Sequence, residues 1–362
     1  MRLGLDATPL LGARTGVGRH VAGLLSGLAE LGEPEELVLT AFTWRGAGPL
    51  AEFSRTGTRQ GRRAPARPLR LAWRHARRPA VEWFTGPVDV FHATNFVLPP
   101  TRSAAGVVTV HDLAFLDHGD TVARASRAYR VLVPRGLARA RAVCAPTRTV
   151  ATALTDRFSL DPGRVVVTPN GLSRPWLDDP RPASAAWLAA HGLPERYLLF
   201  VGTPEPRKNL PWLLSAHREL ADAPPLVLVG PAGWGPSPHG DRVVRAGYLD
   251  EADLVGVVAA ASALVLPSRD EGFGIPPLEA LACGVPVVVS DLPALREVLA
   301  GQARYVPLGD TDALVRALAE TLAADQTIGA PARRGHARGY TWRRCAEAAL
   351  RAYRVATGGA DG

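Results

Sequence analysis

Short apolar runs rich in β-branched residues alternate with helix-periodic segments along the whole chain. Strands are predicted at Leu3–Asp6, Val88–His92, Val107–His111, Ala142–Pro146, Val165–Pro169, Tyr197–Gly202, Leu226–Gly230, Val243–Gly247, Ala263–Pro267, Val287–Ser290 and Ala303–Val306. Helices are predicted at Gly16–Leu31, Thr147–Phe158, Leu210–Ala221, Thr311–Ala323 and Trp342–Arg354. Strands that are apolar on both faces and separated by helices form parallel sheets covered on both sides, so the pattern predicts an α/β fold.

The length of 362 residues predicts two domains, at about 150 residues each. Ser173–Pro194 holds four prolines and the acidic pair Asp178–Asp179, which is typical of a linker. We therefore expect two doubly wound, Rossmann-like domains facing a cleft, at residues 1–172 and 195–340, joined by a linker at 173–194. Ligands of open α/β sheets bind beyond the carboxyl ends of the strands, so candidate site residues are sought there.

Composition excludes several protein classes. The chain is 47% hydrophobic but only 6% aromatic. Its longest apolar stretch, Val255–Leu266, is far shorter than the roughly 20 residues that cross a bilayer. Its first residues lack a long apolar core, so no signal peptide is expected. Three widely spaced cysteines predict neither disulfides nor a metal site, and we expect a cytoplasmic protein.

The net charge is +8, and positive charge is concentrated between Ser54 and Val81. That segment has no acid and nine arginines, namely Arg55, Arg59, Arg62, Arg63, Arg67, Arg70, Arg74, Arg77 and Arg78. It is equally typical of a solvated surface and of a binding face for a phosphate-bearing acceptor, an anionic membrane or nucleic acid. Leu69, Leu71 and Trp73 lie among the arginines, so the segment is also suited to docking on a lipid-linked acceptor at an anionic membrane.

The strongest chemical signal follows the predicted strand Ala263–Pro267 and reads SRDEGFGIPPLEALACG from Ser268 to Gly284. Gly272 and Gly274 allow close backbone approach, and a proline at the first helical position favours helix entry. Amides near Gly274 and Ile275 are suited to a diphosphate or a sugar hydroxyl. Glu279, in the first helical turn, is suited to a ribose, and Glu271, on the loop, to the transferred sugar. The alternative is that both acids only complement the helix dipole.

A second signal, FVGTPEPRKNL, follows the strand at Tyr197–Gly202 and leads into a helix. A diphosphate leaving group needs positive charge, and Arg207 and Lys208 beside a helix start would supply it. Lys208 is the only lysine in a chain with 42 basic residues, which indicates a geometric demand for a compact ammonium. The alternative is a pair of solvated loop cations.

Two weaker signals lie in the first half. The segment RTGVGRH places Gly16 and Gly18 after the first strand, where the loop can pass close to donor phosphates or to the acceptor, although many strand–helix turns look alike. His111 stands at a strand end, where it can bind a sugar hydroxyl and polarise the reacting centre, although a lone histidine is more often structural. Asp112 is expected to orient the His111 ring or to cap the next segment.

No metal ion or other cofactor is expected. Asp310 and Asp312 resemble a metal-binding pair, but they open an apolar-periodic helix, which is typical of an N-cap. Asp178 and Asp179 lie in the predicted linker. No other carboxylate pair after a strand is suited to a divalent ion.

These segments together resemble retaining glycosyltransferase family 4, whose members have the two-domain GT-B fold, and in particular its mannosyl- and rhamnosyltransferase-like members. The resemblance covers nearly the whole chain. It is carried by EGFGIPPLEALACGVPVVVSD, VGTPEPRKN, TGVGRH, VTVHDLAFL, VVTPNG, GYLDEADL and YTWRRCAEAALRAY.

The resemblance implies a role for each matching position. His111, Arg207, Lys208 and Glu271 would be catalytic, with His111 near the reacting carbon and the two cations on the diphosphate. The donor-binding residues would be Gly16, Gly18, Gly202, Thr203, Tyr248, Leu249, Phe273, Gly274, Ile275 and Glu279. Thr203 departs from the arginine that many members have there, and Arg207 would supply the missing charge. Residues 341–362 would form a terminal helix crossing back to the N-terminal domain.

The function implied is transfer of a hexose, mannose or rhamnose by preference, with retention of configuration and by metal-independent front-face displacement. The donor would be GDP-mannose first, then dTDP-rhamnose or a UDP-sugar. The acceptor would be a glycan, a lipid-linked molecule or a small molecule. Alternatives are a GT-B-fold sugar-nucleotide epimerase and a non-catalytic sugar-nucleotide- or nucleic-acid-binding protein. Nucleic acid is not expected, because the chain has no recognisable reader module.

Overall fold

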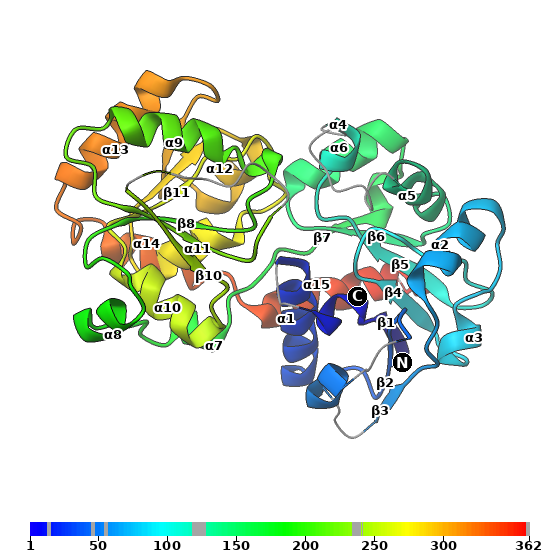
Figure 1. The fold of residues 1–362 in the computed structure, drawn as a ribbon. Helices are drawn as coiled ribbons and strands as arrows, with labels where there is room; N and C mark the ends of the chain where they lie inside the picture. Colours follow the sequence, from blue (N-terminus) through cyan, green and yellow to red (C-terminus); the bar gives the residue numbers. More distant parts are fainter. Residues whose placement is uncertain are drawn as a thin grey trace. The chain divides into compact units, whose positions relative to one another are not determined.

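The computed structural model describes residues 1–12, 16–44, 48–53, 57–117, 128–233, 240 and 242–359. The described chain forms two compact units (Figure 1). The first unit comprises the described residues up to 171 and those from 341 onward, and the second comprises residues 172–340.

The first unit is built on a seven-stranded parallel sheet of order β3-β2-β1-β4-β5-β6-β7. Its strands are β1 (Arg2–Asp6), β2 (Glu36–Thr40), β3 (Thr58–Gln60), β4 (Val90–Ala93), β5 (Ala105–Thr109), β6 (Ala142–Ala145) and β7 (Val165–Val167). Its helices are α1 (Gly16–Glu30), α2 (Ala66–His75), α3 (Glu82–Thr85), α4 (Ala114–Asp117), α5 (Tyr129–Leu137), α6 (Arg148–Phe158) and α15 (Trp342–Thr357), with 3-10 turns at Thr8–Leu11, Gly48–Phe53 and Pro162–Arg164.

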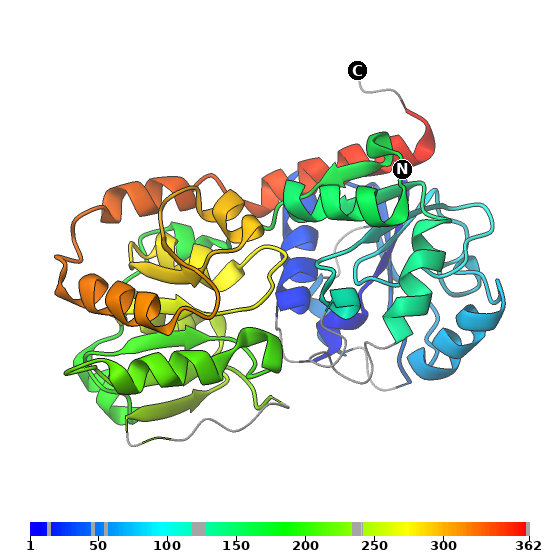
Figure 2. The same cartoon turned by 90° about the horizontal axis from the view of Figure 1, so that it is seen from above.

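Successive strand residues of this sheet belong to two separate cores. Phe91 and Val108 pack on one face, whereas Val90 and Val107 pack on the other. Helices α1 and α15 cover the second face side by side, as Figures 1 and 2 show in blue and red. The terminal helix is therefore part of the first unit's core, although it is the last element of the sequence.

The second unit is built on a six-stranded parallel sheet of order β10-β9-β8-β11-β12-β13. Its strands are β8 (Leu198–Val201), β9 (Leu226–Val229), β10 (Val243–Gly247), β11 (Ala263–Leu266), β12 (Val287–Ser290) and β13 (Arg304–Val306). Its helices are α7 (Arg174–Leu177), α8 (Ala185–Ala190), α9 (Leu210–Glu219), α10 (Glu251–Ala260), α11 (Ile275–Ala282), α12 (Pro293–Leu299), α13 (Thr311–Ala323) and α14 (Ala330–Ala337), with the 3-10 turn η5 at Pro206–Lys208. Helices lie on both faces of the sheet (Figure 1).

The predicted α/β class with two parallel, Rossmann-like sheets is confirmed. Two strands were not predicted. In β2 the sequence ELVLT is as compatible with a helix as with a strand, and pairing with β1 decides between them. Strand β3 is only TRQ, a short polar edge that carries no apolar signal.

The linker predicted at residues 173–194 is wrong in its extent, because this segment packs as part of the second unit. The Trp176 side chain is fully buried, and its Nε1 donates to Glu251 Oε1 at 2.9 Å. Leu188 on α8 is buried in the same core. Of the prolines that suggested a linker, Pro175 lies in the first turn of α7, and the other three lie between or after the two short helices.

No helix in the described part of the chain is both long enough and apolar enough to cross a membrane.

Candidate functional site

The loop after β8 positions the two predicted phosphate-binding cations. Gly202 and Gly230 follow neighbouring strands with positive φ, at 151° and 144°. A Cβ on Gly230 would overlap with the Gly202 carbonyl, so the two loops approach as closely as glycine allows. Arg207 and Lys208 lie on η5, ahead of α9, and Asn209 links the two with left-handed backbone. They therefore precede a helix start, as predicted, on a separate 3-10 turn.

The loop after β11, the strand beside β8, positions Glu271. Ser268 is fully buried, and its hydroxyl donates to Glu271 Oε1 at 2.6 Å. Gly274 ends the loop with a φ of 87°, and a Cβ there would lie 2.5 Å from Leu295 Cδ2. The expectation of a proline at the first helical position is wrong, because α11 begins at Ile275 and Pro276 is its second residue.

These two loops bring Arg207, Lys208 and Glu271 together. Lys208 Nζ lies 2.6 Å from Glu271 Oε1, and Arg207 Nη1 lies 3.4 Å from Glu271 Oε2. The side chains are 13% (Lys208), 15% (Arg207) and 8% (Glu271) exposed, so solvent screens the charges weakly. Burial alone would raise the pKa of Glu271, but the charges of Lys208 and Arg207 outweigh it and lower this pKa to about 2.

Arg207 is fixed by further bonds. Its Nη1 donates to the Asp270 carbonyl at 2.7 Å, and its Nη2 pairs with Glu205 Oε1 at 2.7 Å. Two cations and two carboxylates thus form one cluster at the carboxyl edge of the second sheet, and their formal charges sum to zero. An anion arriving here would meet guanidinium and ammonium donors that are already oriented.

The other predicted donor residues of the second unit differ in accessibility. Tyr248 follows β10 and is exposed, and Leu249 packs against the core. Phe273 is buried, with its ring 5.9 Å from that of Tyr340. Glu279 is 0% exposed and is the fifth residue of α11, so its expected place in the first helical turn is wrong. None of these positions identifies a ligand by itself.

In the first unit, His111 follows β5 at the carboxyl edge of the sheet. Its Nε2 donates to the Thr94 carbonyl at 2.9 Å, and burial lowers its pKa to about 4, so the ring is neutral at pH 7. Asp112 caps the following turn, because its Oδ1 accepts from the Ala114 amide at 3.1 Å. Gly16 and Gly18 open α1, whereas Arg14 and Thr15 of the predicted glycine turn lie outside the described residues.

Sequence reasoning missed His20, which the structure places beside His111. The two ring centroids are 4.9 Å apart in an edge-to-face arrangement. His20 Nδ1 bonds Asn170 Oδ1 at 2.7 Å, and burial lowers the pKa of His20 to about 3. His20 lies in the TGVGRH segment, which was the one hint in the sequence. Its contact with His111 is visible only in the tertiary structure.

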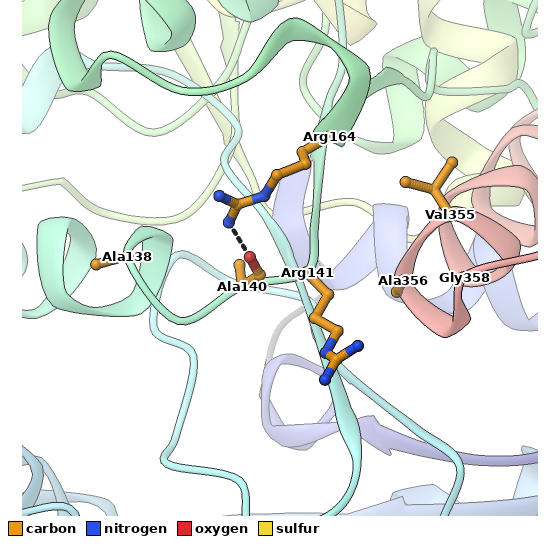
Figure 3. Close-up of a pocket in the computed structure, with 7 residues that line it drawn as sticks. All are labelled: Ala138, Ala140, Arg141, Arg164, Val355, Ala356 and Gly358. Carbon is orange, nitrogen blue, oxygen red and sulfur yellow. Dashed lines mark hydrogen bonds between the residues drawn. The ribbon is translucent and has the colours of Figure 1, made fainter.

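An open hollow of about 370 Å³ lies elsewhere on the first unit (Figure 3). It is lined by Ala138, Ala140, Arg141, Arg164, Val355, Ala356 and Gly358. These residues lie at the amino ends of β6 and β7 and the end of α15, opposite the edge that carries His111. Arg164 donates to the Ala140 carbonyl within it. By the rule for open α/β sheets, this hollow is not the active site.

Asp310 is an N-cap, as predicted, because its Oδ1 accepts from the Ala313 amide at 2.8 Å. Within the described ranges, no three His, Cys, Asp or Glu side chains gather where they could hold one metal ion.

Sequence comparison matches both units to known families. Residues 15–171 match the family described as "Glycosyl transferase 4-like domain", and residues 195–324 match "Glycosyl transferases group 1". The chain is 28% identical to the O-antigen chain mannosyltransferase B of Escherichia coli, over 98% of this chain and 100% of that protein. It is 33% identical to a D-inositol 3-phosphate glycosyltransferase of Segniliparus rotundus, over 80% of this chain and 68% of that protein.

Solved structures show the same fold. A sucrose-phosphate synthase from Thermosynechococcus elongatus superposes with a TM-score of 0.76 at 21% identity, covering 98% of both chains. WaaG, a glycosyltransferase involved in lipopolysaccharide biosynthesis, gives a TM-score of 0.71 at 16% identity, covering 99% of this chain and 100% of that one. Because both units match these families in sequence and the fold is the same, the chain belongs to glycosyltransferase family 4 and is a glycosyltransferase of the GT-B fold.

Proposed function

We propose that this glycosyltransferase moves a hexose, mannose by preference, from a nucleoside diphosphate sugar to an acceptor hydroxyl with retention of configuration. The observation that carries this proposal is the cluster of Lys208, Arg207 and Glu271 at adjacent strand ends of the second unit. A diphosphate leaving group gains negative charge as the glycosidic bond breaks, and oriented cations stabilise that charge.

Each group in the cluster has a proposed task. Arg207 and Lys208 hold the diphosphate oxygens, and Glu271 accepts hydrogen bonds from hydroxyls of the donor sugar. The acceptor hydroxyl attacks on the face from which the diphosphate leaves, and a departing phosphate oxygen takes its proton. Glu279 binds the ribose, and the backbone at Tyr248 and Leu249 contacts the base.

The positive charge in this proposal comes from side chains and not from a divalent ion. Turnover should therefore be unchanged, within about twofold, after dialysis against EDTA. A tenfold loss that Mg²⁺ or Mn²⁺ restores would contradict the metal-independent mechanism.

The donor is proposed from the relatives. Two of them are O-antigen mannosyltransferases, of Escherichia coli and Salmonella typhimurium, which favours GDP-mannose. The Anabaena protein HepE, solved in complex with UDP and glucose, shares the fold at 15% identity with a TM-score of 0.70, covering 97% of this chain and 98% of that one. UDP-sugars and dTDP-rhamnose are therefore tested beside GDP-mannose.

The test begins with thermal shift against GDP, UDP and dTDP, because a true ligand stabilises the folded protein by mass action. The selected donor is then incubated with and without acceptors, and the product anomer is assigned by NMR. Retained configuration in a transferred hexose supports the proposal. An inverted product, or an epimerised donor formed without acceptor, would overturn it.

We further propose that the arginine-rich segment contacts anionic membranes. In the described part of the segment, seven of its arginines are exposed: Arg59, Arg62, Arg63, Arg67, Arg74, Arg77 and Arg78. The large apolar side chains of Leu71, within the segment, and Trp83, just after it, are also exposed. Vesicles containing phosphatidylglycerol should co-float with the protein at low salt and release it at high salt. Equal recovery with neutral vesicles would contradict this contact.

A further inference from the structure

We propose that Asp6, Arg70 and Tyr129 form a subsite that binds hydroxyl groups of a sugar or cyclitol acceptor. This inference rests on the proposed function and adds to it the residues of the first unit that recognise the acceptor. All three lie around the carboxyl edge of the first sheet, where ligands of open α/β sheets bind.

The structure separates Arg70 from the other arginines of its helix. On α2, Leu69 and Trp73 face the core, and Arg67 and Arg74 are exposed. Arg70 is half-buried instead, and its guanidinium lies over the Tyr129 ring, 5.8 Å from the ring centroid. Its charge also acts on Asp6. Burial raises the pKa of Asp6 above its usual value, and the hydrogen bonds from Thr8 and the charge of Arg70 oppose this shift. Arg70 therefore belongs to the sheet edge and not to the general basic surface.

Asp6 presents one carboxylate oxygen to this edge. It is the last residue of β1 and is mostly buried. Its Oδ1 accepts from the Thr8 amide at 2.9 Å and the Thr8 hydroxyl at 2.5 Å. Within the described chain all of its side-chain hydrogen bonds go to Oδ1, which leaves Oδ2 able to accept from a ligand.

Tyr129 connects this pair to His111. Its ring stacks on Phe96 with centroids 5.0 Å apart, and Phe96 contacts the His111 ring at 5.6 Å. Phe96 adopts left-handed backbone, with a φ of 62°, a conformation that costs energy for a side chain of this size. Thr94 makes a second link, because its hydroxyl donates to the Asp6 carbonyl at 2.6 Å and its own carbonyl accepts from His111.

The chemistry of the three groups selects a polyol. A carboxylate oxygen accepts from a hydroxyl, and a guanidinium donates to one, so the pair can bind neighbouring hydroxyls that each donate and accept. Arg70 makes no ion pair with Asp6 within 4.0 Å among the described residues, so both groups keep hydrogen-bonding capacity for a ligand. The Tyr129 ring, held between Phe96 and Arg70, fixes the position of the guanidinium beside them.

The test compares Arg70→Gln and Asp6→Asn with Arg67→Gln and Arg74→Gln, the last two being controls on the same helix. Transfer is measured from the donor selected above to methyl α-mannoside, methyl α-rhamnoside and inositol 3-phosphate. Melting temperature and donor affinity by calorimetry are recorded for each variant. Arg70→Gln and Asp6→Asn should lower kcat/KM for the neutral acceptors about 10- to 100-fold, with donor affinity unchanged, because each removes charge-assisted hydrogen bonds. The controls should stay within twofold of wild type, because these acceptors are soluble and the proposed membrane contact of Arg67 and Arg74 does not enter the assay.

Equal kinetics for Arg70→Gln and Arg67→Gln would overturn the subsite. Loss confined to inositol 3-phosphate would also overturn it, because Arg70 would then bind a phosphate. Loss of donor affinity in Arg70→Gln would do the same. By contrast, failure of the wild-type protein to transfer to any of these acceptors would count against the proposed function. Failure of the subsite and failure of the proposed function can therefore be told apart.

Discussion

Two cations from the loop after β8 hold Glu271, which comes from the loop after the neighbouring strand β11. Neither loop alone could position this carboxylate, since Lys208 and Glu271 are 63 positions apart in sequence. At the scale of single residues, we expect the charge balance of this cluster to affect both turnover and stability.

Replacement of Lys208 by alanine should lower kcat about 100-fold, because one oriented charge on the leaving group is lost. Arg181→Ala, on the exposed surface, serves as the charge-matched control and should retain wild-type turnover. Steady-state kinetics with the selected donor measures both. Turnover of Lys208→Ala within threefold of wild type would remove Lys208 from the mechanism.

The depressed pKa of Glu271 predicts how stability changes with pH. Its folded-state pKa of about 2 lies below the ordinary value of 4.5, so the ionised carboxylate stabilises the fold above pH 4.5. This contribution should disappear as the pH falls from about 4.5 towards 2. Urea unfolding of wild type and Glu271→Gln should therefore differ most near pH 6 and converge near pH 2. A difference that is constant over this range would contradict the pairing.

The residues of this cluster were predictable because each stands out in the local sequence. Lys208 is a single lysine among arginines, and Glu271 follows an apolar run and directly precedes Gly272 and Gly274. Arg70 was not separable from its neighbours, because nine arginines in one acid-free segment look alike in sequence. Its contact with Tyr129 depends on how α2 packs against α5.

At the scale of elements, glycines decide how closely helices approach. Gly23 and Gly27 lie on the face of α1 that meets α15, and a Cβ on either would overlap with Trp342. In sequence they reduce the helix propensity of α1, whereas in the structure they permit the contact between the two helices.

Gly27→Ala should therefore destabilise the protein by about 1–3 kcal/mol, because the added methyl has to displace the backbone of Trp342. Gly335→Ala is the matched helical control. It lies in α14 with nothing within 4 Å of the added Cβ, and it should stabilise by about 0.5–1 kcal/mol. Chemical denaturation measures both changes. Equal effects of the two substitutions would refute close packing of α1 on α15.

At the scale of the whole molecule, the last helix completes the first unit. Tyr353 on α15 is fully buried, and its hydroxyl lies 2.8 Å from His92 Nδ1 on β4. The chain thus leaves the first unit after Gly171 and returns to it at Thr341. The second unit is consequently an insertion between two parts of the first.

Tyr353→Ala should cost roughly 3–5 kcal/mol, because it opens a large cavity in the core of the first unit. Tyr353→Phe keeps the ring and should cost only about 1 kcal/mol for the lost hydrogen bond. In scanning calorimetry, a transition of the first unit should move down in temperature while that of the second unit stays in place. A shift of both transitions by the same amount would contradict this assignment.

The sequence by itself determined the fold class, both sheets in outline and the loops that carry Arg207, Lys208, Glu271 and His111. These features follow from local pattern, since hydrophobic period and glycine position act within a few residues. Tertiary structure alone decided that residues 173–194 belong to the second unit and that His20 meets His111. It also decided that Arg70 lies at the sheet edge, apart from the exposed arginines of the same segment. The physical reason is that burial and long-range contact, which set these three outcomes, depend on elements far apart in the chain.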